Sequence, residues 1–484
     1  MHGIVYDDTN RNGAQDAGEP GIAHVGVSDG VVVAVTDADG RYGFDAIKGA
    51  TVFVIKPRDW APPVDAHRQP QFFRKADPGG AADFPLQRGE EPDRFRVLVL
   101  TDPQPASAAE VGYFEKTIAA PLAGTREFAF SVTLGDIVYD RHELYALLAQ
   151  AVARVGIPAY AINGNHDLDL GAADDRRATA SFEAAHGPST YAFHYGRALF
   201  VGLNNVRFLG GPRYIGGLRS DQFTFLENLL KATPPGELLV MMVHIPWFYP
   251  NALNPETFRV ADRARLFALL KDRPHVLWLS GHTHYQRHVF HGTADGWAGT
   301  SPLHEFNVAA ACGSFWGGPP DHDGIPLATM ADGTPQGYGI LTVEETDVRT
   351  DYRAARSSPG DQIGLHVPVS ALPRAGFVSY YANVFNGHEG WTVESRVDER
   401  AWNALRRVLE WDPSYARLYL AQDDRATPLA TPRLPDPVVC HHLWRGILPA
   451  DLPPGRHVVE VRATDPAGQI FTAKGEVRIA AASP

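Results

Sequence analysis

Residues 128–139 read Phe-Ala-Phe-Ser-Val-Thr-Leu-Gly-Asp-Ile-Val-Tyr. The first part of this stretch is short and mostly apolar, as in a strand that is buried on both faces of a parallel sheet. The apolar run ends at Gly135-Asp136, so a carboxylate stands where the chain turns away from the sheet. Ligands of α/β domains gather at this carboxyl end of the strands. The stretch therefore predicts an α/β domain with a functional site near Asp136.

The same arrangement recurs after other apolar runs. Metal-ligating residue types follow the runs 96–100, 159–162, 238–243 and 276–279, and they are Asp102, Gln104, Asn165, His166, Asp167, His244, His282 and His284. Helical stretches separate several of these runs, so we expect a layered α/β domain in which the strand ends converge. Carboxylate, imidazole and amide groups suit hard-to-borderline divalent ions. Two such ions about 3.5–4 Å apart can clamp a phosphate and activate water, so the sequence predicts a two-metal site.

These blocks resemble the calcineurin-like metallophosphoesterases, whose pattern runs Asp-x-His, Gly-Asp, Gly-Asn-His-Asp/Glu, His and Gly-His-x-His. The resemblance implies a four-layer α/β/β/α core that hydrolyses phosphoesters at a binuclear metal centre. One metal is then held by Asp102, Gln104, Asp136 and His284. The other is held by Asp136, Asn165, His244 and His282, with Asp136 as the bridge.

The resemblance also implies a mechanism. A metal-activated hydroxide attacks phosphorus, and His166 protonates the leaving group as general acid. Asp167 is expected to orient His166 through a hydrogen bond. Gln104 stands where most of the family has His. The neutral oxygen of Gln104 is a harder ligand than imidazole, so we expect Mn²⁺ to be bound in preference to Fe²⁺, Mg²⁺ or Zn²⁺. Alternatively, Gln104 contacts a ligand residue and does not bind the metal itself.

The expected substrate is a small phosphorylated molecule carrying a nucleotide, sugar or lipid headgroup. A phosphodiester is slightly favoured, and phosphomonoesterase or protein phosphatase-like activity stays open. An alternative of another class is a non-catalytic cell-surface binding protein on the same scaffold. Residues expected near the substrate are Asn205, Tyr214, Arg287 and His442.

Residues 1–92 are predicted to form an N-terminal β-sandwich and linker, and the catalytic domain is expected over 93–350. Residues Asp8, Asn10, Asn12, Asp16 and Glu19 fit the register of a calcium loop. An ordinary Asx-rich turn would give the same pattern. The segment also resembles the start of prealbumin-like β modules that bind calcium in exported proteins, which implies a role outside the cytoplasm.

Residues 351–484 are predicted to form a mostly β, α+β accessory domain with one helix near 399–410. This part resembles a domain that accompanies bacterial members of the family. Together with the N-terminal module, which resembles modules of exported proteins, this leads us to expect a periplasmic or extracellular enzyme.

Composition narrows the classes of partner. The chain has 484 residues and a formal net charge of −12, which argues against broad binding of nucleic acid. No apolar run approaches the length of a membrane-spanning helix. Cys312 and Cys440 leave both one disulfide and two free thiols open. The oligomeric state is not predicted.

Overall fold

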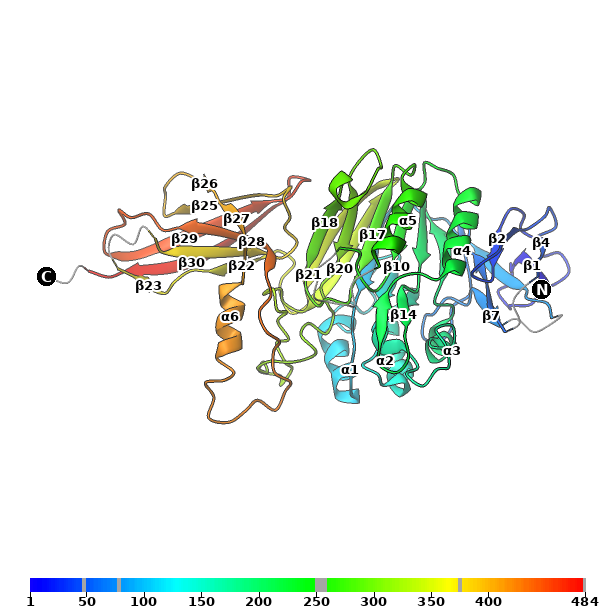
Figure 1. Cartoon of the computed structure of the whole chain (residues 1–484), viewed down its shortest axis with the longest axis horizontal. Coiled ribbons are helices and arrows are strands. Elements are labelled where there is room, and N and C mark those ends of the chain that lie inside the picture. Colours follow the sequence, from blue (N-terminus) through cyan, green and yellow to red (C-terminus); the bar gives the residue numbers. More distant parts are fainter. Residues whose placement is uncertain (46–48, 76–79, 249–258, 373–376, 482–484) are drawn as a thin grey trace. The chain divides into compact units, whose positions relative to one another are not determined.

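The computed structural model describes residues 1–45, 49–75, 80–248, 259–372 and 377–481. It divides into two compact units (Figure 1). The first unit comprises Met1–Thr283, Val289–Asn307 and Ile340–Thr350. The second comprises His284–His288, Val308–Gly339 and Asp351–Pro484.

The N-terminal part of the first unit consists of two four-stranded sheets. One has the order β4 (Arg41–Gly43), β1 (His2–Asp7), β8 (Phe84–Arg88), β6 (Trp60–Ala61). The other has the order β3 (Val33–Val35), β2 (Gly26–Ser28), β5 (Thr51–Ile55), β7 (Phe73–Lys75). The strands are two to six residues long, and β5 is buried along its whole length.

Two larger sheets form the catalytic core. The five-stranded sheet has the order β11 (Ala159–Ile162), β10 (Phe130–Leu134), β9 (Arg94–Leu100), β20 (Gly337–Glu344), β21 (Asp347–Ala354). The six-stranded sheet has the order β12 (Tyr191–Tyr195), β13 (Ala198–Gly202), β16 (Leu238–Met242), β17 (Val276–Ser280), β19 (Leu303–Asn307), β18 (Arg287–His291). Strands β9, β10 and β11 are parallel, and so are β13, β16, β17 and β19. Their carboxyl ends therefore share an edge in each sheet.

Aromatic side chains fill the space between these two sheets. Phe130 of β10 lies edge-on to Phe193 of β12 and Phe200 of β13, with ring centroids 5.4 and 5.1 Å apart. Such rings bury a large apolar area and pack in fixed orientations, so they hold the sheets face to face.

Helices connect the strands on the outer sides, which gives the expected α/β/β/α layering. The helices that follow strands of the five-stranded sheet are α1 (Ala108–Phe114), a π-helical turn (Glu115–Ala119), α2 (Tyr145–Ala153) and α3 (Ala180–His186). Those that follow strands of the six-stranded sheet are α4 (Ser220–Ala232) and α5 (Val260–Leu270). Short 3₁₀ turns occupy His142–Leu144, Asn165–Asp167 and Thr293–Asp295, and a small ribbon pairs β14 (Val206–Phe208) with β15 (Tyr214–Gly216).

The second unit contains two further sheets and one helix. Its first sheet has the order β22 (Ile363–His366), β24 (Ser379–Val384), β28 (Cys440–Ile447), β27 (Arg406–Glu410). Its second has the order β23 (Ser370–Ala371), β30 (Ile470–Ile479), β29 (Gly455–Thr464), β25 (Thr392–Val397), β26 (Asn403–Ala404). A shared apolar cluster that includes Trp391, Trp444 and Val459 packs between them. Cys312 and Cys440 are both buried free thiols.

The helix expected near 399–410 is wrong. That segment forms the edge strands β26 and β27, and β27 pairs antiparallel with β28. The helix of this unit is α6 (Pro413–Leu420), where the Asp412 side chain accepts a hydrogen bond from the Tyr415 backbone N–H. Asp followed by Pro is a helix-start signal that the sequence already carries. Within the described residues, no helix is both long and apolar enough to cross a bilayer.

Candidate metal centre

Asp136 lies at the centre of the candidate site. It follows β10 directly and is 1% exposed. One carboxylate oxygen accepts the His166 backbone N–H at 2.8 Å. The other accepts from the Gln104 amide at 3.2 Å and lies 3.4 Å from Nε2 of His244. A buried carboxylate with both oxygens among ligand-type side chains is suited to bridge two cations.

His244 is fixed in the tautomer that metal binding needs. It follows β16, is fully buried, and its Nδ1 donates to the Leu134 carbonyl at 2.8 Å. Its Nε2 is therefore the nitrogen that would bind a metal ion, and it lies 3.0 Å from Oδ1 of Asn165. A backbone carbonyl on the distal nitrogen is the usual way in which proteins orient a ligating histidine.

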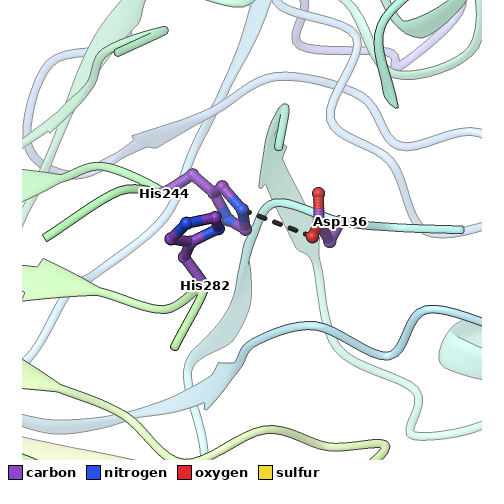
Figure 2. A group of neighbouring side chains, drawn as sticks. All are labelled: Asp136, His244 and His282. Carbon is purple, nitrogen blue, oxygen red and sulfur yellow. Dashed lines mark ion pairs between the residues drawn. The ribbon is translucent and has the colours of Figure 1, made fainter. Parts of the chain in front are cut away.

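His282 completes the group that Figure 2 shows. Ligand atoms of Asp136, His244 and His282 all lie within 4.8 Å of one another. The rings of His244 and His282 are 5.0 Å apart at an angle of 69°. Two imidazoles and a carboxylate at this spacing fit a divalent ion.

Charge in the centre favours a cation. Burial alone would lower the pKa of His244, but the carboxylates of Asp136 and Asp102 raise that pKa to about 9. Burial alone would raise the pKa of Asp136, but His244, His166 and His282 hold it well below its usual range. Each group thus needs an opposite charge beside it, and a bound metal ion would supply positive charge to the carboxylates.

The loop after β9 brings Asp102 and Gln104 to the same place. Asp102 is fully buried, and its carboxylate accepts the His282 backbone N–H at 3.0 Å. Gln104 is 3% exposed and contacts Asp136. The backbone N–H groups of both residues donate to the loop after β10, at Gly135 and Asp136. Three strand ends therefore lock together around the predicted ligands.

Backbone strain marks the same residues. Asp102, Gln104, Asp136 and His282 all have positive φ, between 44° and 71°. Side chains other than glycine rarely adopt this conformation, and such residues cluster at functional sites. The neighbouring Gly164 must lack a side chain, because a Cβ there would lie 2.1 Å from Oδ1 of Asp136.

His166 is held on two sides by residues that follow Asp136 in the chain. Its Nδ1 lies 3.0 Å from the Asp140 carboxylate, and its ring stacks on Tyr139 at a centroid distance of 4.3 Å. His166 keeps 22% of its side chain exposed. The group that orients His166 is Asp140, which the sequence prediction missed.

Asp167 has another role than predicted. Its carboxylate accepts the backbone N–H groups of Ile137 and Gly164 and the hydroxyl of Tyr145. These contacts turn it away from the His166 ring and toward the loop that carries Asp136. Burial and the nearby Asp136 charge raise the pKa of Asp167 to about 6, against the lowering effect of the backbone donors. Asp167 therefore fixes the ligand loop.

His284 falls in the second compact unit. Its Nδ1 donates to the Gly313 carbonyl at 2.8 Å, and its ring stacks on Phe315 at 4.2 Å. Nδ1 is thus oriented by a backbone carbonyl in the same manner as in His244, and the role of His284 as a metal ligand stays a prediction.

The predicted substrate residues separate into different roles. Asn205 is fully buried, and its amide oxygen accepts the backbone N–H groups of His244 and Ile245 at 3.1 and 3.0 Å. Its amide nitrogen donates to the Ile245 carbonyl, so Asn205 holds the His244 loop and the prediction of a substrate contact is wrong. Tyr214 lies edge-on to His282 with ring centroids 6.1 Å apart, which keeps it a candidate.

His442 is also no substrate residue. It is 1% exposed in the second unit, with Nε2 3.0 Å from Asp332 and Nδ1 2.7 Å from the Asn383 amide oxygen. Both ring nitrogens are engaged in this buried network. Arg287 lies in the same unit beside His441, whose pKa burial lowers to about 4 with a contribution from the Arg287 charge. A substrate contact of Arg287 therefore stays a prediction.

The predicted calcium residues form a loop between β1 and β2. The Asp16 carboxylate accepts from the side-chain amides of Asn10 and Asn12, both at 2.7 Å. These hydrogen bonds lower the pKa of Asp16. Asp8 accepts the backbone N–H groups of Asn12 and Gly13, and Glu19 accepts those of Asn10 and Asp16. Side-chain and backbone contacts thus order the loop, and calcium binding there stays a prediction.

Family models match most of the chain. The model for the calcineurin-like phosphoesterase domain matches residues 95–286. Models for the N-terminal and C-terminal parts of calcineurin-like phosphoesterases match residues 9–88 and 305–471. The chain belongs to the calcineurin-like phosphoesterases. It is therefore a metal-dependent phosphoester hydrolase, and this family's dinuclear centre fits the donor set around Asp136.

Solved structures add only distant similarities to this phosphoesterase. A purple acid phosphatase from yellow lupin (Lupinus luteus) seeds is 12% identical with a TM-score of 0.38, and the match covers 71% of this chain and 66% of the lupin chain. Vps29 from Chaetomium thermophilum is 10% identical with a TM-score of 0.21, and the match covers 79% of this chain and 98% of that one. No curated protein matches the chain.

Proposed function

We propose that this enzyme hydrolyses a phosphodiester at a binuclear manganese centre, with His166 as the general acid. The observation that carries the proposal is the group of Asp136, His244 and His282, of which the first two are buried, with His166 beside it. When bound, the ions would supply Lewis-acid charge to the phosphate and lower the pKa of water toward neutrality. Manganese is favoured because Gln104 contributes an amide in place of an imidazole.

The chain's own residues would then act on the leaving group. Asp140 and Tyr139 fix the His166 ring, so that Nε2 can hold a proton toward the departing oxygen. Proton transfer from a positioned side chain contributes about 10²–10⁴-fold to rate. Asn165, Asp102 and His284 complete the two ligand sets in this proposal, with His284 assigned from the sequence pattern.

Preference for a diester rests on charge. A phosphomonoester carries about −1.5 to −2 near neutral pH and asks for more positive charge than a diester does. Arg141 follows Asp140 in the chain, and its Nε donates to the Glu143 carboxylate at 2.6 Å. Because that guanidinium is already balanced, the site suits a substrate with a single negative charge. A monoesterase is the second candidate.

The test compares both ester classes with one enzyme. Full-length protein is stripped of metal, reloaded with Mn²⁺ and assayed on bis-nitrophenyl phosphate and nitrophenyl phosphate. We expect a higher kcat/KM for the diester, and a higher value for the monoester would reverse the substrate assignment. Asp136→Asn and His282→Ala should abolish turnover of both, and full activity of either variant would sink the assignment.

We also propose that the enzyme acts outside the cytoplasm, on the resemblance of its flanking domains to exported modules. Cell fractionation of the native host tests this, and recovery of the enzyme in the cytoplasm would contradict it.

A further inference from the structure

Glu305 is a buried carboxylate that the chemistry described so far does not use. It lies in β19 with no exposed surface. A buried carboxylate is costly unless hydrogen bonds or an ion pair compensate it, and removal of one partner from such a network is expensive. Its partners therefore indicate which parts of the fold depend on it.

Two of these partners lie close in the chain to His244 and His282: Trp247 in the loop after β16, and Ser280 at the end of β17. One oxygen of Glu305 accepts the backbone N–H of Trp247 at 2.6 Å and the hydroxyl of Ser280 at 3.4 Å. Trp247 lies three residues after His244, and Ser280 lies two residues before His282. One carboxylate thus connects the loop after β16 with the end of β17, and each of these two segments carries one imidazole of the candidate centre.

Asn307, two residues after Glu305 in β19, adds further contacts to the segment that carries His282. β17 and β19 are parallel, with Trp278 opposite Glu305 and Ser280 opposite Asn307. The Ser280 hydroxyl has one proton, which Glu305 shares with the Asn307 amide oxygen at 3.2 Å, and the Asn307 amide nitrogen donates to the Thr283 hydroxyl at 2.6 Å. Since Thr283 follows His282 directly, the network contacts the chain on both sides of that ligand.

His291 is the partner of the other carboxylate oxygen of Glu305. Its Nε2 lies 2.7 Å from that oxygen, and the two side chains are 1% and 0% exposed. Nδ1 of His291 is buried without a hydrogen-bond partner.

We propose that Glu305 is a positioning residue for the metal centre, which sets the separation of His244 and His282 by holding their two loops. The role rests on the proposed binuclear centre. Removal of a residue that orients a metal ligand typically lowers metal affinity or activity about 10–100-fold. Among the described residues, Glu305 contacts the Trp247 backbone N–H, the Ser280 hydroxyl and His291, so its effect on His244 and His282 acts through the chain segments that carry them.

The test is a Mn²⁺ titration of metal-free, full-length protein, with unbound Mn²⁺ followed by electron paramagnetic resonance. Glu305→Ala should weaken Mn²⁺ binding about 10–100-fold at one site or more. Glu305→Gln keeps an oxygen for the Trp247 N–H and should lose less. Near-saturating Mn²⁺ should restore most of kcat in both variants, because Glu305 does not touch substrate.

A matched control exists at the opposite end of the same sheet. Glu237 immediately precedes β16 and pairs with His194 at 2.8 Å, so Glu237→Ala also removes the acid of a Glu–His pair. This variant should bind Mn²⁺ like the wild type. Equal weakening in Glu237→Ala and Glu305→Ala would overturn the proposal, because the effect would then be general destabilisation.

Unchanged Mn²⁺ affinity in a folded Glu305→Ala protein also overturns the role. If that variant does not fold, Glu305→Gln and Ser280→Ala decide, and wild-type affinity in both would refute it. Failure of the wild type to bind Mn²⁺ would instead remove the proposed centre itself, and the role with it. The titration therefore distinguishes the two failures.

Discussion

His166 is fixed by one carboxylate and one aromatic ring. Asp140 contacts its Nδ1 at 3.0 Å and Tyr139 stacks on its ring. A histidine held in one orientation loses less freedom when it delivers a proton. The residues that follow Asp136 thus serve the proposed acid step, while Asp136 itself serves the metals.

Replacement of Asp140 tests this arrangement. Asp140→Asn should lower kcat about 10–100-fold, because the amide does not favour the same tautomer of His166, and KM should change little. Steady-state kinetics on the diester measures both constants. Tyr139→Phe keeps the stacked ring and is the control with near wild-type kcat. An Asp140→Asn enzyme with wild-type kcat would show that His166 needs no orienting partner.

The elements that build the centre are strand ends followed by tight turns. Gly135 has φ +87°, and a Cβ on Gly164 would meet the backbone nitrogen of Asp136 at 2.2 Å. The loops after β10 and β11 can approach each other only because glycine stands at these points. Strand order then sets which side chains meet.

Gly164→Ala should therefore disturb the centre. The added Cβ would lie 2.1 Å from Oδ1 of Asp136, so the carboxylate or the loop must shift. We expect a loss of stability of about 1–3 kcal/mol and Mn²⁺ binding weakened at least tenfold. Denaturant unfolding and metal titration measure the two effects. Gly171→Ala is the control, since nothing lies within 4 Å of its added Cβ, and similar losses in both variants would contradict the steric reason.

At the scale of the whole molecule, metal binding is linked to stability. A ligand present at about 100 times its Kd stabilises the folded state by about 2.7 kcal/mol. Saturating Mn²⁺ should raise the midpoint of thermal unfolding by several degrees, and a chelator should reverse the shift. Scanning calorimetry measures this, with Asp136→Asn as the control. An equal shift in that variant would place the stabilising ions elsewhere.

Stability should also depend on pH through His186. Burial, with a smaller contribution from His67, lowers the pKa of His186 from 6.5 to about 4. The unfolded chain takes up this proton near pH 6.5 and the folded protein only near pH 4, so stability is complete above pH 6.5 and falls between these values. The loss is on the order of 1–3 kcal/mol.

His186→Phe removes this titration and should flatten the fall in stability between pH 6.5 and 4. Urea unfolding at several pH values measures the difference from the wild type. His322, with 89% of its side chain exposed, supplies the control variant His322→Phe, which should keep the wild-type slope. Equal acid sensitivity of the His186→Phe and wild-type proteins would contradict the prediction.

The α/β core and the residues of the candidate centre were predictable from the sequence. An apolar run that ends in Gly-Asp or Gly-Asn-His is a local pattern, and parallel strands bring their ends together by a general rule. The helix predicted near 399–410 was wrong because the structure of this segment depends on a distant part of the chain. β27 is a strand because it pairs with β28, and residues near 406 say little about a partner near 445.

The sequence by itself thus determined the class of fold and the class of reaction, and it predicted the ligand set around Asp136. Only the tertiary structure decided which residues position the site residues. Asp140, and not Asp167, contacts the His166 ring, Asn205 holds the His244 loop, and Glu305 contacts the loop that carries His244. The physical reason is that a residue's ability to bind a metal ion, and its place at the end of a strand, are local features of the sequence. The direction of a side chain and its hydrogen-bond partner depend on residues that only folding brings together.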